Sequence, residues 1–160
     1  MANFQPMAAV KMLGGSPVPL LRGIEAAGQS YLRGALLVNS AGSLAVAAAD
    51  PAVETLVGIA ANAATGTTGA EVLFAPLVPD LVIEATIDIA AGTLALTQAM
   101  LYSPFGIGVD AGRFFIDQAD TAAANVRVIP IELRDAVGTV SARIYALFFP
   151  AASIWGNNGV

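Results

Sequence analysis

The sequence predicts an all-β, mainly antiparallel fold, a compact β-barrel or sandwich with an extended N-terminal arm and at most one short helix. Short apolar segments recur about every ten residues between glycine, proline and aspartate, a spacing typical of barrels and sandwiches. The clearest unit is 29–64, in which apolar runs 30–39 and 43–49 flank Ala41-Gly42. Glycine at such a link favours a tight hairpin turn.

The remaining strands follow from the same pattern. Pro51 ends the hairpin because proline has no N–H for a ladder. In 81–88 the residues alternate, which places polar Glu84 and Thr86 on the wetter face. The expected strands are 19–25, 30–39, 43–49, 55–64, 71–77, 81–88, a hairpin over 107–116 that turns at 108–112, then 126–134 and 139–149.

One helix is expected, over 90–102. Leu94, Gln98 and Leu101 have roughly helical spacing, and Pro104 would end the helix.

The chain of 160 residues is expected to form one domain, with an N-terminal arm over 1–18, a barrel or sandwich over 19–150 and a tail over 151–160. The first segment mixes prolines and glycines with apolar residues that keep no period, so it is either a docking arm or a frayed terminus. The residues expected to contact a neighbour are Phe4, Met7, Val10, Met12 and Leu13.

The composition indicates a surface that is covered by something other than water. Charged residues make up 12% of the chain, against about 25% in ordinary globular domains, and the mean hydropathy is +0.72. Lipid or other protein subunits could cover such a surface. Membrane insertion is disfavoured, because the longest charge-free span, 89–109, contains glycines, threonines and a proline.

Nucleic acid is not an expected partner. The net charge is −5, and the seven basic residues are spread along the whole chain. Phosphate binding requires clustered cations.

The side chains needed for common catalysis are scarce. The sequence has no histidine and no cysteine, which removes the commonest general base and the thiol nucleophile. No G-x-S-x-G or phosphate-binding glycine loop occurs. The sequence therefore predicts neither an enzyme nor a bound cofactor.

Three carboxylates, Asp110, Asp117 and Asp120, are the one cluster with a metal-ligand character. Oxygen ligands suit a hard cation such as calcium, but the spacing matches no EF-hand loop. Aspartates also cap backbone N–H groups in turns, and this interpretation is favoured over a metal site.

Paired aromatic residues offer candidates for a subunit contact. Phe114-Phe115 and Phe148-Phe149 place one ring on each face of a strand, so one ring fills the core and the other is free to meet another subunit. The expected interface residues are Phe115, Phe149 and Trp155.

The order of the β segments carries a resemblance. A glycine-rich start leads into an apolar strand at 28–37 (GQSYLRGALL), a small turn follows at 41–44 (AGSL), and a Val-Gly-Ile strand at 57–60 (VGIA). The run 131–139 (IELRDAVGT), continuing to 149, forms a closing hairpin. In this arrangement the sequence resembles the capsid decoration (cement) proteins of tailed bacteriophages.

The resemblance implies a non-enzymatic clamp on the outer capsid surface of a virion. Such proteins form small cyclic oligomers, often homotrimers, over junctions between subunits of the major capsid protein, and their arms reach onto the shell. Two alternatives stay open: another virion subunit, such as a head fibre or tail component, and a carbohydrate- or ligand-binding β-barrel.

Overall fold

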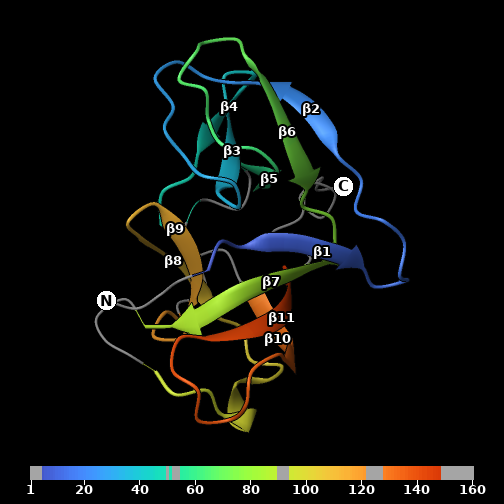
Figure 1. Cartoon of the computed structure of the whole chain (residues 1–160), viewed down its shortest axis with the longest axis vertical. Coiled ribbons are helices and arrows are strands. Elements are labelled where there is room, and N and C mark those ends of the chain that lie inside the picture. Colours follow the sequence, from blue (N-terminus) through green and yellow to red (C-terminus); the bar gives the residue numbers. More distant parts are fainter. Residues whose placement is uncertain (1–4, 50, 52–54, 90–93, 122–127, 149–160) are drawn as a thin grey trace.

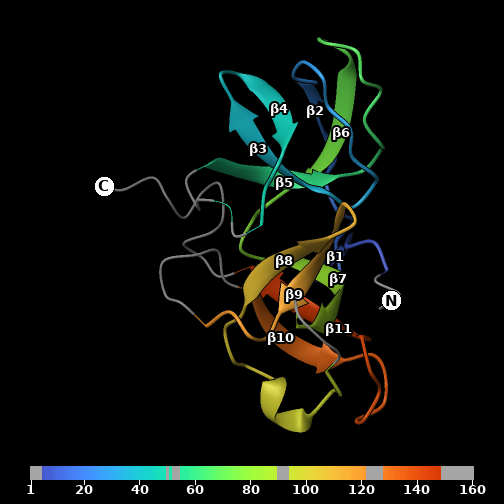
Figure 2. The same ribbon diagram turned by 90° about the vertical axis from the view of Figure 1, so that its left-hand side faces the viewer.

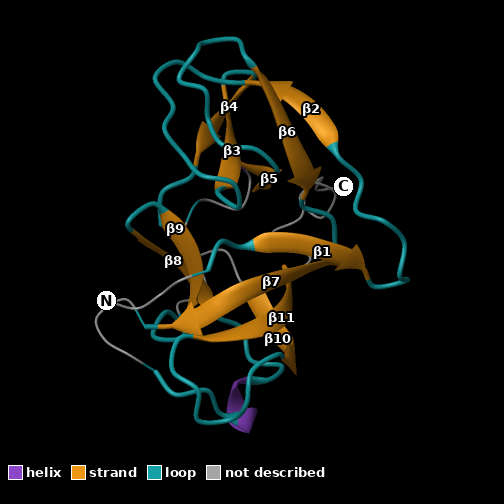
Figure 3. Cartoon of the chain, viewed as in Figure 1, coloured by secondary structure: helices purple, strands orange, loops and turns teal. Residues whose placement is uncertain are grey.

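The chain folds into two β-sheets in a computed structural model that describes residues 5–49, 51, 55–89, 94–121 and 128–148 (Figures 1 and 3). Sheet A contains β1 (Ala8–Met12), β7 (Leu81–Asp88), β8 (Gly106–Asp110), β9 (Arg113–Asp117), β10 (Val128–Leu133) and β11 (Ala142–Phe148). Sheet B contains β2 (Leu21–Ile24), β3 (Leu36–Ser40), β4 (Ser43–Val46), β5 (Leu56–Ala60) and β6 (Glu71–Pro76). The all-β, mainly antiparallel prediction is confirmed, in its sandwich-like form.

Sheet B has the strand order β2-β6-β5-β3-β4 and contains the predicted hairpin. Ser40 pairs with Ser43 across a two-residue turn, in which Ala41 has φ 50° and Gly42 has φ 88°. Positive φ at both central positions gives the type I′ turn whose twist matches that of paired strands. The Asn39 Oδ1 accepts a hydrogen bond from the Gly42 N–H at 2.9 Å and supports the turn.

The two outer strands of sheet B meet at one end. Glu25, directly after β2, forms an isolated bridge with Leu44 of β4, and the Ala26 N–H donates to the Leu44 carbonyl at 2.9 Å. Gly23 allows this approach, because a Cβ there would collide with the Leu44 side chain. The sheet therefore curls around its own apolar side chains without forming a closed barrel.

A buried carboxylate holds the loop between β5 and β6. Glu25 is fully buried, and its oxygens accept hydrogen bonds from the Thr65 N–H at 2.8 Å and the Gly66 N–H at 2.7 Å. Burial, and then the Glu25 charge, raise the pKa of the neighbouring Tyr31 hydroxyl. These hydrogen bonds fix the loop at this end of sheet B.

Sheet A is built around β7. β11 pairs along one edge of β7 from Val82 to Ile87, while β1 and β9 share the other edge. The β7–β9 pairing is parallel, and all the other strand pairs are antiparallel. In Figure 1, β1 lies between β7 and sheet B, and in both Figures 1 and 2 the β8–β9 hairpin also reaches toward sheet B.

The expectation that Glu84 and Thr86 lie on the wetter face of β7 is confirmed for Glu84 and wrong for Thr86. Thr86 is fully buried, and its Oγ1 accepts a hydrogen bond from the Gln5 N–H at 3.2 Å, while Glu84 is half-buried. The segment before β1 covers this face, which a local alternation pattern has no means of signalling.

The expected helix over 90–102 is also wrong in its described part, 94–102. Ala95 forms an isolated bridge with Val140, and the Leu96 N–H donates to the Thr139 carbonyl at 2.8 Å. Only a 3-10 turn, η2 (Gln98–Met100), is helical there. Burial of Leu96 against the loop before β11 outweighs the weak helical spacing.

Candidate functional site

The segment predicted as an arm contains a strand of the chain's own sheet. Ala8 pairs with Glu84 and Met12 pairs with Leu81, and the Leu13 N–H donates to the Asp80 carbonyl at 2.9 Å. Met7 is 1% exposed and belongs to the hydrophobic core. The prediction of an extended arm is therefore wrong for the described residues, because residues 8–12 pair with β7 and Met7 packs in the core.

Two of the five candidate arm residues still present large side chains to solvent. Val10 is 40% exposed and Leu13 is 54% exposed, whereas Met12 is half-buried. Val10 is the bulged residue of β1, since the register skips from Ala9 to Lys11. Phe4 lies outside the described residues.

The expected aromatic interface is not formed by Phe115. Its ring is fully buried and lies over Gly108, where a Cβ would collide with it. Phe114, on the opposite face, fills the core. Both faces of this hairpin are thus covered, and Phe149 and Trp155 lie outside the described residues.

Asp110, Asp117 and Asp120 lie near β8 and β9, and among the described residues no group of three or more potential metal-ligand residues is found. The Asp117 Oδ1 accepts a hydrogen bond from the Ala119 N–H at 3.0 Å, as expected of a turn cap. Asp110 lies opposite Arg113 beside the Ala111-Gly112 turn, and the Asp120 side chain packs against Gly106.

Charged side chains gather on the outer face of sheet A. Glu84 lies 3.4 Å from Arg143 and 3.6 Å from Arg134, and Arg143 also contacts Asp135 at 3.0 Å. The Tyr145 ring lies beneath both Lys11, at 5.1 Å, and Arg134, at 4.8 Å. A cation–π contact of this kind contributes about 0.5–1 kcal/mol at an exposed site.

We expect the Asp135–Arg143 pair to make stability depend on pH in the acid range. The Arg143 side-chain hydrogen bond, and then the Arg143 backbone N–H, lower the pKa of the Asp135 carboxyl. Because this pKa lies below the unfolded value of about 3.9, the stabilisation is present above that pH and is lost as pH falls through the folded pKa.

In Asp135→Asn, melting temperature should fall less steeply with acid than in the wild type below about pH 4. Since the Arg143 side chain is 43% exposed, the effect should stay at about 1 kcal/mol or less. The exposed Asp80, as Asp80→Asn, is the control. Parallel acid melting curves for wild type and Asp135→Asn would contradict the assignment.

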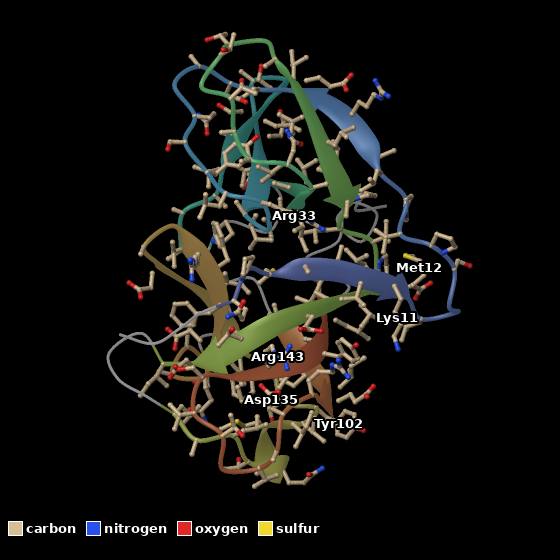
Figure 4. The ribbon with its side chains drawn as sticks, viewed as in Figure 1. Lys11, Met12, Arg33, Tyr102, Asp135 and Arg143 are labelled. Carbon is tan, nitrogen blue, oxygen red and sulfur yellow. The ribbon has the colours of Figure 1, made fainter. Side chains whose placement is uncertain are left out.

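Two hollows flank the segment that leads into β1. One, of about 390 Å³, lies between β1 and sheet B and is lined by Met7, Ala8, Ala9, Val10, Pro17, Val18, Leu20, Arg33, Ile59, Ala60, Ala61 and Ala75. The other, of about 260 Å³, is lined by Gln5, Pro6, Met7, Ala8, Arg33, Glu84 and Arg143. Arg33 lines both, and Figure 4 places it between β1 and sheet B.

The hollows and Arg33 are absent from the sequence-based site. They are built by residues 5–10 and 59–61, which only tertiary folding brings together. Exposed leucine and isoleucine side chains nearby on β2 and before it were missed for the same reason. They are Leu20, Leu21 and Ile24.

No known protein-family model matches the chain, and no curated protein sequence matches it. Among the described residues, no helix has the length and apolar character needed to cross a membrane.

Proposed function

We propose that this protein is a capsid decoration protein that binds the outside of an assembled phage head at junctions between major capsid protein subunits. The observation that carries the proposal is an exposed apolar surface on β1, β2 and their connection. Its members are Val10, Leu13, Leu20, Leu21 and Ile24, each at least 40% exposed. We call this set the β1–β2 surface.

The β1–β2 surface suits protein contact better than solvent. Exposed aliphatic side chains that lie together mark interaction sites, whereas single ones are ordinary, and Val10 and Leu20 line the same hollow between β1 and sheet B. The 12% charge content leaves few charged groups to cover the exterior. Contact with sister copies, with the shell, or with both would remove this apolar area from water.

The proposed mechanism is stabilisation by binding. A cyclic homotrimer would place several copies of the β1–β2 surface on the shell at once, so that weak contacts add through multivalency. Binding that is specific to the assembled shell stabilises it by mass action. No bond chemistry is needed for this role.

The test combines solution mass with shell binding. Mass photometry should show a trimer, and the protein should sediment with expanded shells at a fixed copy number without binding free major capsid protein. If the protein is strictly monomeric in solution and does not bind expanded shells, the proposal is refuted.

The double variant Leu21→Asp/Ile24→Asp should lose trimer formation or reduce shell occupancy by about tenfold or more, because charges would enter a desolvated apolar contact. Val137→Asp is the matched control, since Val137 is 60% exposed and lies away from β1 and β2. Circular dichroism checks that both variants fold. Wild-type behaviour of the double variant would remove the β1–β2 surface from the proposal.

A further inference from the structure

The Tyr31 hydroxyl is a buried polar group that has no hydrogen-bond partner among the residues that the structure describes. Tyr31 is 6% exposed, and its hydroxyl oxygen is shielded from solvent. A buried hydroxyl that stays unbonded destabilises a fold, and the large majority of such groups bond to protein atoms or to an ordered water. The Tyr31 hydroxyl therefore calls for a partner that is not a described protein group.

The Glu25 carboxylate lies in the same part of the fold. The Thr65 N–H donates to the Glu25 Oε2 at 2.8 Å, and the N–H of the preceding residue, Ala64, donates to the Tyr31 carbonyl at 3.0 Å. Two consecutive residues of one loop thus hold Glu25 and Tyr31 near each other. Burial, and then the Glu25 charge, raise the pKa of the Tyr31 phenol, so its hydroxyl keeps a proton to donate.

The Glu25 carboxylate has room for one more donor. An ionised carboxylate offers about four acceptor positions, two on each oxygen. Oε2 accepts hydrogen bonds from the Thr65 N–H at 2.8 Å and the Thr65 hydroxyl at 3.1 Å. Oε1 accepts only one from the described residues, from the Gly66 N–H at 2.7 Å. Since Glu25 is fully buried, its remaining acceptor position is shielded from bulk solvent, as the Tyr31 hydroxyl is.

We propose that a single buried water molecule links Tyr31 to Glu25, accepting a hydrogen bond from the Tyr31 hydroxyl and donating one to the Glu25 Oε1. Water suits this place because it is small and is both a donor and an acceptor, and buried waters in proteins make about two to four hydrogen bonds to such groups. Calcium or magnesium suits it less, because these ions need about six or more oxygen ligands. The described residues provide no group of three or more potential metal-ligand residues.

The water would help to order the loop between β5 and β6. Residues 65–69 are all exposed, so hydrogen bonds, and not burial, hold this loop in place. Most of these bonds lead to Glu25. Its carboxylate accepts from Thr65 and Gly66, its carbonyl accepts from the Gly69 N–H at 2.9 Å, and its N–H donates to the Ala70 carbonyl at 2.8 Å. A water that fixes the carboxylate therefore supports the whole loop.

The variant Tyr31→Phe, which removes the hydroxyl and keeps the ring, tests the site by the sign of its effect. If water links the hydroxyl to Glu25, the equilibrium constant for unfolding should rise about threefold to tenfold, because a bridged hydrogen bond is lost. If the hydroxyl is unbonded, its removal should leave stability unchanged or increase it, and either result would overturn the inference. Tyr102→Phe is the control, since Tyr102 is 73% exposed and should show no change.

Amide hydrogen exchange measures the effect on the loop. In Tyr31→Phe the Thr65 and Gly66 amides should exchange about threefold or more faster, relative to the amides of β11, than they do in the wild type. Exchange at Thr65 and Gly66 that keeps its wild-type ratio to β11 would show that the hydroxyl does not support the loop through Glu25, and the inference would fail.

A high-resolution crystal structure of the full chain shows the occupant directly. The wild type should contain one density peak within hydrogen-bonding distance of both the Tyr31 hydroxyl and the Glu25 Oε1, and Tyr31→Phe should lack it. The melting temperature should be the same in sodium chloride and in choline chloride. A wild-type structure without the peak, or a higher melting temperature in sodium chloride that assigns the site to a cation, would overturn the inference.

Discussion

Asp88→Ala should lower the free energy of unfolding by about 2–4 kcal/mol, among the largest effects of any single polar substitution in this chain. Asp88 ends β7 and is fully buried. Its Oδ1 accepts hydrogen bonds from the Ile89 N–H at 2.8 Å and the Leu94 N–H at 2.9 Å, and its Oδ2 accepts one from the Ser141 hydroxyl. Alanine would leave these donors without their acceptor in a poorly hydrated site.

The position of Asp88 between three segments of the chain raises the free-energy cost of removing its carboxylate. Its carboxylate joins the end of β7 to residue 94 and to Ser141, which has φ 49° and begins the return into β11. The Ser141 N–H in turn donates to the Leu94 carbonyl at 3.3 Å. Removing the charge recovers some desolvation energy, which keeps the net loss below the sum of the separate bonds.

Two controls separate this network from ordinary capping. Ser141→Ala removes one hydrogen bond and should cost about 1 kcal/mol. Asp117→Ala removes a carboxylate that caps the Ala119 N–H beside a pairing with Asp88, and it should cost about the same. Urea unfolding measures all three. If Asp88→Ala lowered the free energy of unfolding no more than Asp117→Ala, the buried network would contribute no more to stability than an ordinary turn cap.

Local patterns were enough to predict the hairpins. Ser40 to Ser43 and Asp110 to Arg113 enclose the same Ala-Gly pair, and a two-residue turn with positive φ is specified by its own residues. The strands 71–77 and 81–88 were also found nearly to their ends, because proline and glycine bound them. These features depend on contacts between near neighbours in sequence.

The errors concern residues whose state is decided by distant parts of the chain. Met7 is apolar, which fits the prediction of a residue that contacts a neighbour. Its burial in the chain's own core depends on Gly34 and on the pairing between β1 and β7. Phe115 is buried because Gly108 leaves room for its ring. Arg33 became a candidate binding residue only when the structure placed it in two hollows. A single sequence does not show which residues, distant along the chain, will contact one another in the fold.

Gly34→Ala should destabilise the fold by about 3 kcal/mol or more, through strain and a clash at the same position. Gly34 is buried with φ 88°, and the left-handed conformation alone costs an alanine about 1–2 kcal/mol. A Cβ there would also collide with the Met7 carbonyl oxygen and lie 3.1 Å from the Met7 nitrogen and 3.2 Å from the Pro6 Cβ. Both neighbours are backbone or ring atoms that have little freedom to move aside.

The variant Gly42→Ala measures the cost of the left-handed backbone conformation without a steric clash. Gly42 has the same φ of 88°, but nothing lies within 4 Å of the added Cβ, so its loss should stay near about 1–2 kcal/mol. In Gly34→Ala the segment before β1 must move, and amide hydrogen exchange in β1 should therefore accelerate relative to that in β3. Equal losses in the two variants, with β1 still protected, would mean that the packing of Gly34 on Met7 does not hold β1 in place.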